Sequence, residues 1–242
     1  MNNGRGAILN QENSVGETIQ ERIKTIRLAI AKACQKVQRD PETVKIVAVS
    51  KSFSPSLIKE AIQCGVTNFG ENYLQEALPK MQALREKNCT WHFIGHLQKN
   101  KAFAVAFHFQ LIHSVDSFPL AERLNKAGEK LQKKVPVLLQ FKGKPGFGFS
   151  PNELLNMAPR LAGLPWLDYR GIMIIAPLVM KPEEARPYFK KARELLTQLK
   201  KYFRESFQEL SMGMTEDFPV AIEEGATMIR IGRGIFGERK SI

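Results

Sequence analysis

The sequence has no long apolar run, since no stretch of about 18 consecutive apolar residues occurs in its 242 positions. We therefore predict no membrane-spanning helix. Residues 1–17 also lack the apolar core of a secretory signal, which favours a cytoplasmic protein. Cysteine is scarce. The odd number and wide spacing of Cys34, Cys64 and Cys89 argue against a disulfide framework or a metal motif, so we interpret them as small core residues.

Acidic residues are too few to balance the basic ones. The chain has 36 Lys and Arg residues against 24 Asp and Glu residues, a net charge of +12. This excess raises the question of nucleic-acid binding. The basic residues are scattered over helical patterns, however, and no nucleic-acid motif accompanies them, so we do not expect specific nucleic-acid binding. Attraction of phosphorylated small molecules is a milder consequence of the same charge.

The chain also has no linker, internal repeat or low-complexity tract, so we expect one domain over residues 17–242, preceded by a flexible tail at residues 1–16. Strand and helix patterns alternate through this domain. Strands are predicted at 44–50, 66–69, 90–94, 110–115, 135–141, 169–175, 209–212 and 227–231. Helices are predicted at 16–39, 54–65, 73–87, 98–107, 119–133, 151–161, 182–203 and 217–224.

Alternation of strands with helices predicts parallel pairing through right-handed crossovers. Eight such units in a chain near the typical barrel length of about 250 residues favour a closed ring. We therefore predict an α/β fold of the (β/α)8 TIM-barrel type. A doubly wound open sheet is the structural alternative.

A barrel of this type carries its chemistry just after the strands, at their carboxyl ends. Polar residues of this sequence gather at those positions. They are Lys51, Gly70–Tyr73, Gly95–Asn100, Asp116–Ser117, Ser211–Thr215 and Arg230–Gly234.

Lys51 closes a run that otherwise reads as a buried strand. An amine that loses part of its water there favours its neutral, nucleophilic form, which attacks aldehydes such as pyridoxal phosphate. The alternative is that Lys51 simply reaches solvent. Glu71 is a candidate general acid or base near Lys51, or equally its ion-pair partner.

Glycine-containing loops follow the last two strands, where TIM barrels commonly bind phosphate. Ser211 offers a hydroxyl donor beside Gly213, and Gly232 and Gly234 flank Arg233. Glycines let backbone N–H groups approach an anion, although they also serve tight turns. These loops therefore predict a phosphate cradle, with tight turns as the alternative.

The four histidines do not predict a metal site. His92 and His96 lie four apart across a strand-to-loop junction, and no carboxylate is an obvious partner for them or for His108 and His113. We interpret all four as histidines with satisfied hydrogen bonds and predict no bound metal.

Several longer motifs carry a family resemblance over about residues 20–239. They lie at 46–51, 69–76, 91–101, 210–215, 221–222, 225–227 and 230–237. In these motifs the chain resembles the pyridoxal phosphate homeostasis protein family, which is related to the N-terminal domain of alanine racemase. The resemblance implies a single-domain barrel of pyridoxal phosphate (PLP) fold type III.

The resemblance also implies roles for six residues toward PLP. Lys51 would hold the cofactor as an internal aldimine, and Arg230 would face the pyridine nitrogen. Asn72 would lie near the cofactor. The phosphate would be held by Ser211, Gly232 and Arg233.

Arg230 in that position has a physical consequence. A guanidinium is always charged and only donates hydrogen bonds, so it does not keep the ring nitrogen protonated. The ring is then a poorer electron sink, which suits holding the cofactor better than turnover. The family has no established turnover and is linked to vitamin B6 and to amino- and keto-acid homeostasis.

Two departures from the family pattern stand out. The loop at 142–149 lacks one lysine that is expected near the cofactor, so no role is assigned to that loop. Many relatives carry Ser or Thr where this chain has Arg233.

We therefore predict a monomeric, cytoplasmic carrier or regulator of PLP that exchanges it with PLP-accepting apoenzymes. A weak amino-acid racemase or another PLP enzyme is the alternative. A nucleic-acid-binding protein and a cofactor-free phosphosugar barrel enzyme are more distant alternatives.

Overall fold

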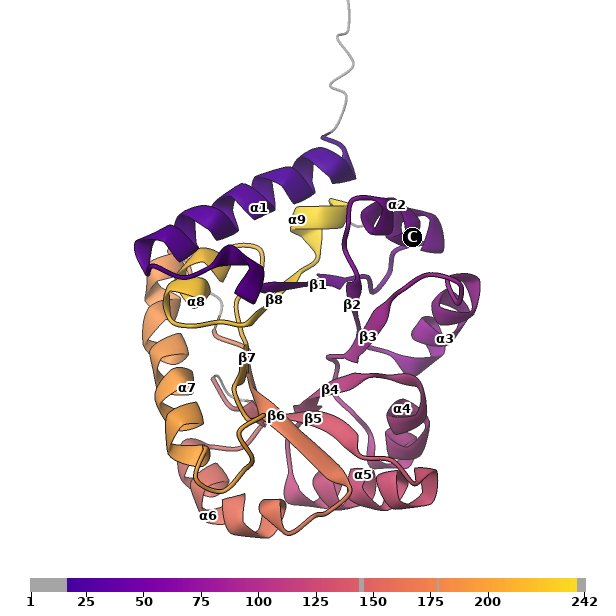
Figure 1. Ribbon diagram of the computed structural model, residues 1–242, viewed down its shortest axis with the longest axis vertical. Helices are drawn as coiled ribbons and strands as arrows, with labels where there is room; N and C mark the ends of the chain where they lie inside the picture. Colours follow the sequence, from indigo (N-terminus) through magenta and orange to yellow (C-terminus); the bar gives the residue numbers. More distant parts are fainter. Residues whose placement is uncertain (1–16, 144–145, 178, 239–242) are drawn as a thin grey trace, which may run out of the picture.

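A computed structural model describes residues 17–143, 146–177 and 179–238, so the tail expected at residues 1–16 lies outside the described residues. Eight parallel strands close into one barrel in chain order, and β1 pairs with β8 to complete the ring (Figure 1). The predicted (β/α)8 barrel is confirmed, and the open-sheet alternative is wrong. The strands are β1 Lys45–Val49, β2 Asn68–Glu71, β3 Thr90–Phe93, β4 Leu111–Val115, β5 Val135–Phe141, β6 Leu167–Ile174, β7 Glu209–Ser211 and β8 Met228–Ile231.

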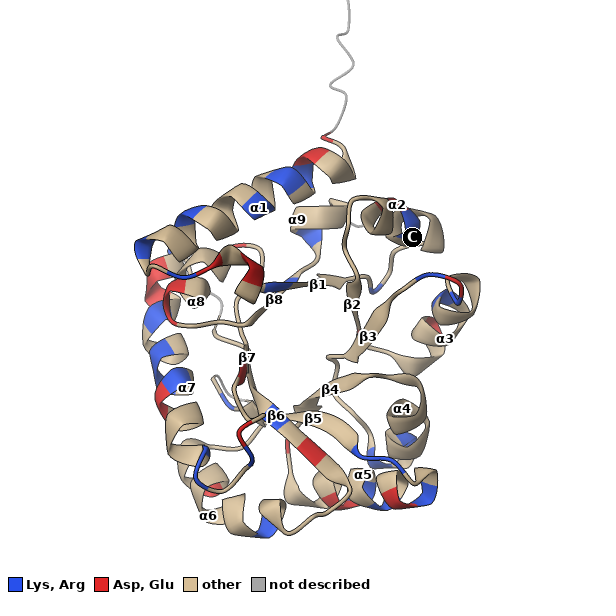
Figure 2. Ribbon diagram, in the orientation of Figure 1, with Lys and Arg blue, Asp and Glu red and all other residues tan. Residues whose placement is uncertain are grey.

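Helices surround the ring, and most of the charged residues lie on them and on the connecting loops (Figure 2). Short 3-10 turns precede β1, α4 and α7, at Pro41–Thr43, Lys99–Lys101 and Pro182–Ala185. The α-helices are α1 Ile19–Lys36, α2 Pro55–Gln63, α3 Leu74–Ala83, α4 Ala102–His108, α5 Phe118–Leu131, α6 Pro151–Ala162, α7 Arg186–Leu199, α8 Phe218–Glu223 and α9 Arg233–Phe236.

Local sequence signals explain where the clearest helices begin. The side chain of Thr18 accepts the N–H of Glu21, and the Glu21 side chain accepts the N–H of Thr18, so α1 starts with a capping box. Ser150 and Glu153 repeat this arrangement at α6, where Pro151 occupies the first helical position. These caps satisfy backbone donors that have no acceptor within the helix.

Several predicted elements are wrong at their bounds, among them the helix at 73–87, which ends at Ala83. Strand β2 begins at Asn68 rather than at 66, because the N–H of Val66 donates to the carbonyl of Ala61 and completes the end of α2. The predicted helices at 98–107 and 182–203 both start as 3-10 turns. The second of them ends at Leu199 instead of continuing to 203.

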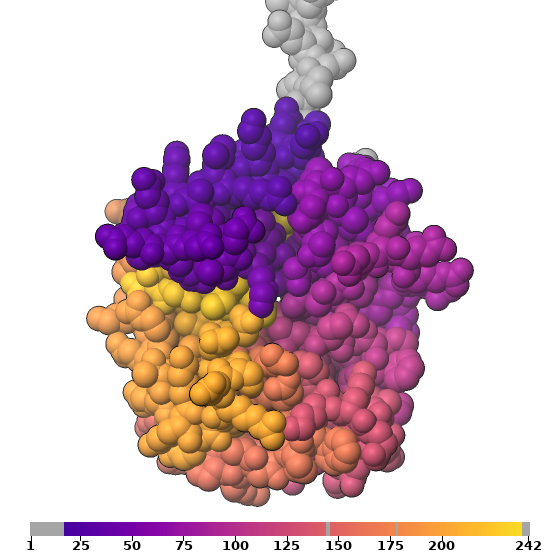
Figure 3. Space-filling view, viewed as in Figure 1, coloured from indigo at the N-terminus to yellow at the C-terminus, as the bar shows by residue number. Residues whose placement is uncertain are grey.

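Each strand has one face toward the helices and one toward the barrel interior. The outward faces pack with the helices into the main hydrophobic core, whose largest fully buried side chains include Phe69, Phe189 and Phe207. Side chains fill the interior, and the space-filling view shows atoms across the middle of the ring (Figure 3). Five of them form a small separate apolar cluster, Val47, Leu111, Leu138, Met173 and Met228.

Candidate functional site

A pocket of about 300 Å³ lies at the carboxyl ends of β1 and β8 and the loop after β7. Four of the six predicted site residues line it, namely Lys51, Arg230, Gly232 and Arg233. Ser211 and Asn72 are not among its lining residues. The rest of the wall is Val49, Pro177, Val179, Met180, Pro182, Met214, Thr215, Glu216 and Asp217.

The alternation of β1 explains why Lys51 faces this pocket. Val47 belongs to the interior cluster, Val49 lines the pocket, and Lys51 follows two positions later. The chain then turns at Ser52, whose φ of 67° is left-handed and whose N–H donates to the Glu76 carboxylate. Lys51 is therefore held at the tip of an inward-facing row. The neutral state expected for its amine stays a prediction.

Arg230 forms the floor of the pocket and is 5% exposed. Its Nη1 donates to Ser211 Oγ at 2.7 Å and its Nη2 to the carbonyl oxygen of Ile174 at 2.8 Å. Burial lowers the pKa of the guanidinium to about 10, and the nearby Asp217 carboxylate opposes this shift. Arg230 therefore stays charged near neutral pH and meets a ligand only as a donor.

Ser211 lies inside the barrel, fully buried, and its hydroxyl is occupied. Its Oγ accepts from Arg230 and lies 2.8 Å from Nδ1 of His113. Thr215, four residues later, lines the pocket instead. Sequence reasoning missed Thr215 because it treated the first hydroxyl of this motif as the one beside the ligand.

The turns after β7 and β8 require glycine at two points. Gly213 has a left-handed φ of +87°, and a Cβ there would lie 2.7 Å from the Ala221 methyl. A Cβ on Gly234 would lie 2.9 Å from Ile231 Cγ2 and 3.0 Å from Thr215 Cγ2. The glycines thus let these two turns approach each other at the pocket wall.

Arg233 lies at the edge of the pocket, and its side chain is 57% exposed. Its guanidinium is 3.9 Å from Glu216 and 3.7 Å from Glu238, distances too long for strong ion pairs. Its backbone N–H lies in the first turn of α9, where N–H groups have no intrahelical acceptor. The backbone of this turn is therefore a more direct donor than the side chain.

Glu71 pairs with Lys80 and Ser50. The carboxylate is fully buried on the outer side of β2, and it accepts from Lys80 Nζ at 2.8 Å and from Ser50 Oγ at 2.7 Å. Lys80 also donates to the carbonyl oxygen of Ser50 and to Glu76. Burial raises the pKa of Glu71, and the hydrogen bonds from Lys80 and Ser50 oppose this. The group is a buried structural ion pair that the sequence reasoning did not anticipate.

Asn72 follows β2 at the mouth of the barrel and is half-buried. A Cβ on Gly95 would lie 2.3 Å from the Asn72 carbonyl oxygen, so glycine is needed for the two loops to touch. The packing fixes the backbone of Asn72, while its predicted place beside a cofactor stays a prediction.

The prediction that no carboxylate pairs with His96 is wrong, whereas the hydrogen bonds expected for His92, His96 and His113 are present. His96 does have a carboxylate partner, because its Nδ1 lies 3.1 Å from Asp116 Oδ2. Its ring also stacks on Phe147, with ring centroids 3.7 Å apart. His92 and His113 are buried inside the barrel and contact each other at 2.8 Å.

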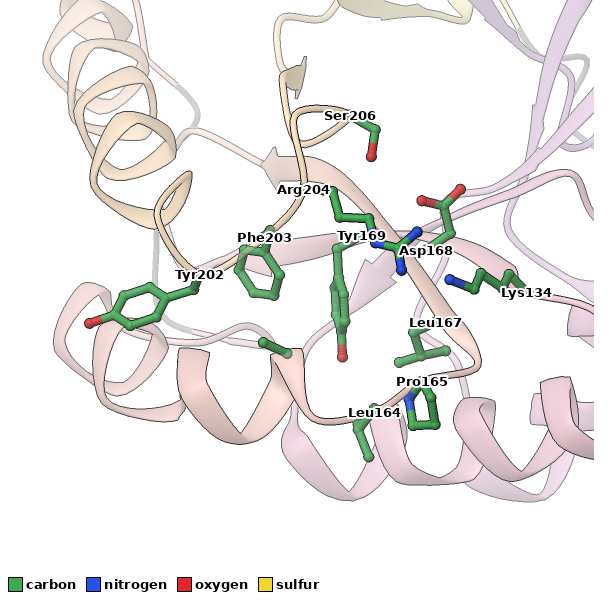
Figure 4. Close-up of a pocket in the computed structure, with 11 residues that line it drawn as sticks. Lys134, Leu164, Pro165, Leu167, Asp168, Tyr169, Tyr202, Phe203, Arg204 and Ser206 are labelled. Carbon is green, nitrogen blue, oxygen red and sulfur yellow. The ribbon is translucent and has the colours of Figure 1, made fainter.

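A second cavity of about 300 Å³ lies at the opposite end of the barrel, where the chain leads into β5, β6 and β7 (Figure 4). Arg204, Asp168 and Tyr169 converge on it, and Lys134 stands at its edge. Asp168 accepts from Arg170, and the Tyr169 hydroxyl donates to the carbonyl of Leu161. The predicted site residues lie at the other end, where TIM barrels carry their chemistry.

Comparison with known proteins connects this geometry to a family. The model of the family described as alanine racemase, N-terminal domain, matches residues 26–240. The chain is 39% identical to the pyridoxal phosphate homeostasis protein of Aquifex aeolicus, over 91% of this chain and 98% of that protein. It is 40% identical to the protein of the same name from Haemophilus influenzae, over 91% of this chain and 96% of that one.

The solved structures add a neighbour with a ligand. PipY of Synechococcus elongatus, solved with PLP bound, is 38% identical in sequence and has a TM-score of 0.81. The match covers 91% of this chain and all of that one.

Proposed function

Because the chain belongs to the pyridoxal phosphate homeostasis proteins of the alanine racemase N-terminal domain family, we propose that it binds PLP and acts in vitamin B6 and amino- and keto-acid homeostasis. One observation carries the proposal: the Lys51 amine and the Arg230 guanidinium line the same pocket at the strand ends. The PLP-bound neighbour supports the same ligand class, and the proposed site has the fold type III architecture.

The donors of the pocket fit three polar parts of PLP, namely the aldehyde, the ring nitrogen and the phosphate. Lys51 supplies the amine for the aldehyde, and Arg230 supplies charged N–H groups for an acceptor such as the ring nitrogen. We propose that the Thr215 hydroxyl and the backbone N–H groups of Gly232 and Arg233 donate to the phosphate, because all three residues line the pocket. We propose that Thr215 takes the phosphate role first predicted for Ser211, whose hydroxyl is occupied. Asn72 is proposed only as a neighbour of the cofactor.

The pocket residues favour holding over turnover. When bound, PLP supplies an electrophilic aldehyde and an electron-withdrawing ring. Arg230 does not donate a full proton to that ring near neutral pH, because its pKa is about 10. Asp217 accepts the Met214 N–H at 2.6 Å, which occupies one oxygen of the buried pocket acid. We propose that the protein holds PLP and passes it to PLP-accepting apoenzymes.

The absorption spectrum of the purified protein tests the proposal. We expect a visible or near-ultraviolet cofactor band, and borohydride reduction followed by peptide mapping should place the label on Lys51. A protein that remains colourless after addition of PLP would reject the proposal. Sustained exchange of solvent deuterium into alanine at C2 would show instead a racemase-like enzyme.

The oligomeric state and the cellular location of the protein are also proposed. Within residues 17–143, 146–177 and 179–238, no helix combines the length and apolarity of a membrane span. We propose a monomer located in the cytoplasm. Sedimentation at several protein concentrations checks the monomer, and fractionation of the source cells checks the location.

A further inference from the structure

A continuous line of polar side chains crosses the barrel interior below the pocket. Arg230 donates to Ser211 at 2.7 Å, and Ser211 Oγ lies 2.8 Å from His113 Nδ1. His113 Nε2 lies 2.8 Å from His92 Nδ1, and His92 Nε2 lies 3.1 Å from Asn68 Oδ1. We call these five residues the interior chain. It joins β8, β7, β4, β3 and β2, one residue from each strand.

At the pocket end of the interior chain, Arg230 determines where the hydroxyl proton of Ser211 points. Arg230 carries only donors, so the oxygen of Ser211 must accept from it. The hydroxyl proton of Ser211 then points toward the other close partner, Nδ1 of His113. A neutral His113 that accepts at Nδ1 carries its own proton on Nε2.

The Asn68 end of the interior chain sets the same direction of hydrogen-bond donation independently. The amide nitrogen of Asn68 donates to Thr67 Oγ1 at 3.1 Å, which leaves its carbonyl oxygen facing His92. A carbonyl oxygen only accepts, so His92 carries its proton on Nε2 and accepts at Nδ1. His113 Nε2 is then the donor between the two rings, in agreement with the assignment from the pocket end.

Both histidines are neutral in this arrangement. Burial lowers the pKa of His92 to about 4 and holds that of His113 well below its ordinary value. Positive charges on other strands add to this effect: Lys45 on β1 acts on His92, and Arg230 on β8 acts on His113. No carboxylate hydrogen bond to either ring occurs among the described residues, so nothing there favours an imidazolium.

We propose that His92, His113 and Ser211 are positioning residues that hold Arg230 in register with a PLP ring. The inference rests on the proposed function and deepens it. Ser211 and the Ile174 carbonyl accept two of the five N–H groups of the Arg230 guanidinium, and Arg230 itself lines the pocket. A rotated or loosened Arg230 would lose this geometry.

Burying the polar side chains of the interior chain costs free energy of solvation, which suggests that they have a function. Buried polar groups need partners, and apolar residues would fill the same space without that requirement. The barrel already fills the rest of its interior in that way, with the cluster around Val47 and Met228. The interior chain is polar along the whole path that ends at Arg230.

The first arm of the test needs no cofactor. Long-range proton–nitrogen NMR of the apoprotein, with labelled histidine, reports the tautomer of each ring. We expect His92 and His113 to be neutral, with the proton on Nε2, from pH 6 to pH 8. A charged ring or a proton on Nδ1 for either residue in this range would overturn the inference, whether or not the protein binds PLP.

The second arm measures release of bound PLP by rapid dilution into an excess of an aldehyde trap. We expect His113→Leu to release PLP about tenfold faster than wild type, the loss expected for one or two buried hydrogen bonds. His113→Gln keeps an acceptor and a donor and should recover part of this loss. Met228→Leu, an interior change two residues before Arg230 on the same strand, is the matched control and should stay within about twofold.

Melting temperatures of the apoproteins separate positioning from folding. If His113→Leu releases PLP no faster than Met228→Leu, the inference is wrong. If release accelerates equally in His113→Leu and His113→Gln in proportion to lost thermal stability, the role is structural and the inference is again wrong. Failure of the wild-type protein to bind PLP would reject the proposed function itself, a result that neither variant produces.

A more distant variant sharpens the test. Asn68 lies at the far end of the interior chain, beside a separate cavity of about 410 Å³. Asn68→Leu removes the acceptor that orients His92 without touching the pocket. We expect a mixture of His92 tautomers and about threefold faster PLP release, whereas unchanged tautomers in this variant would contradict the assigned direction.

Discussion

The outer and inner faces of the barrel sheet belong to the same eight strands but carry different kinds of side chain. The outer face packs large apolar side chains such as Phe69 against the helices in one extended core. The inner face divides its space between a five-residue apolar cluster and a connected polar chain that ends at the pocket. The outer face therefore carries most of the stability, and the inner face positions the groups that meet a ligand. Four predictions test this division, in order of decreasing effect.

Loss of the Lys51 amine should remove cofactor retention almost completely while the fold survives. Lys51→Ala should show no cofactor band and at least about a hundredfold faster loss of added PLP, because the covalent link is gone. Its melting temperature should stay within a few degrees of wild type, since Lys51 is at a strand tip. Spectra and thermal melts check both points. Lys45→Ala, at the other end of the same strand, is the control and should keep the band.

A cavity in the outer face should have the opposite effect, a loss of stability with little change in PLP binding. Phe69 is fully buried between β2 and the helices, so Phe69→Ala should lower the free energy of unfolding by about 3–5 kcal/mol. Denaturant titration measures this loss. Binding of PLP well below the melting temperature should change by less than about threefold. A tenfold loss of binding in the folded variant would mean that the two faces are not separable.

Acid should destabilise the protein through the inner face. His92 has its pKa lowered from 6.5 to about 4 by burial, so between these values the unfolded chain binds more protons than the folded one. The stability tied to His92 is complete above pH 6.5 and is lost as pH falls toward 4, by about 3 kcal/mol. Chemical denaturation at several pH values measures the slope. His92→Gln should reduce the slope and leave the part that comes from His113, and an unchanged slope would contradict this assignment.

Arg233 should matter least of the predicted site residues. Its side chain is exposed, and among the residues that the structure describes its ion pairs are long contacts to Glu216 and Glu238. Arg233→Ala keeps the backbone donor, so PLP affinity should fall by no more than about threefold, through lost long-range attraction of the phosphate. Titration at low and high salt measures this. A loss above tenfold would place the guanidinium on the phosphate.

The parts of the molecule that could be predicted were those with a local signal. Strand β5 was predicted at its observed bounds because its apolar run is sharply bordered by Lys134 and Lys142. Lys51 and Arg230 were found because strand ends meet at one edge of a barrel. Their placement in one pocket agrees with that reasoning, while their roles toward PLP remain predictions.

The parts that escaped prediction depend on contacts between distant segments. His113 and Ser211 are 98 positions apart, and no spacing rule links them. The ion pair of Glu71 with Lys80 depends on how α3 packs over β2, which residue patterns do not specify. Thr215 and Asp217 lie beyond the end of β7, where the path of the loop decides which side chain meets the pocket.

The single direction of the interior chain has an electrostatic consequence. Each hydrogen bond from Ser211 through His113 to His92 is a small dipole, and all of them point the same way, so their fields add. The negative end of this array faces the guanidinium of Arg230, much as the carboxyl end of a helix faces a cation. The guanidinium of Arg230, which is 5% exposed, is thus supported by aligned neutral groups in addition to the nearby Asp217 carboxylate. Because the guanidinium is buried, dissolved salt hardly screens its attraction for a bound ligand.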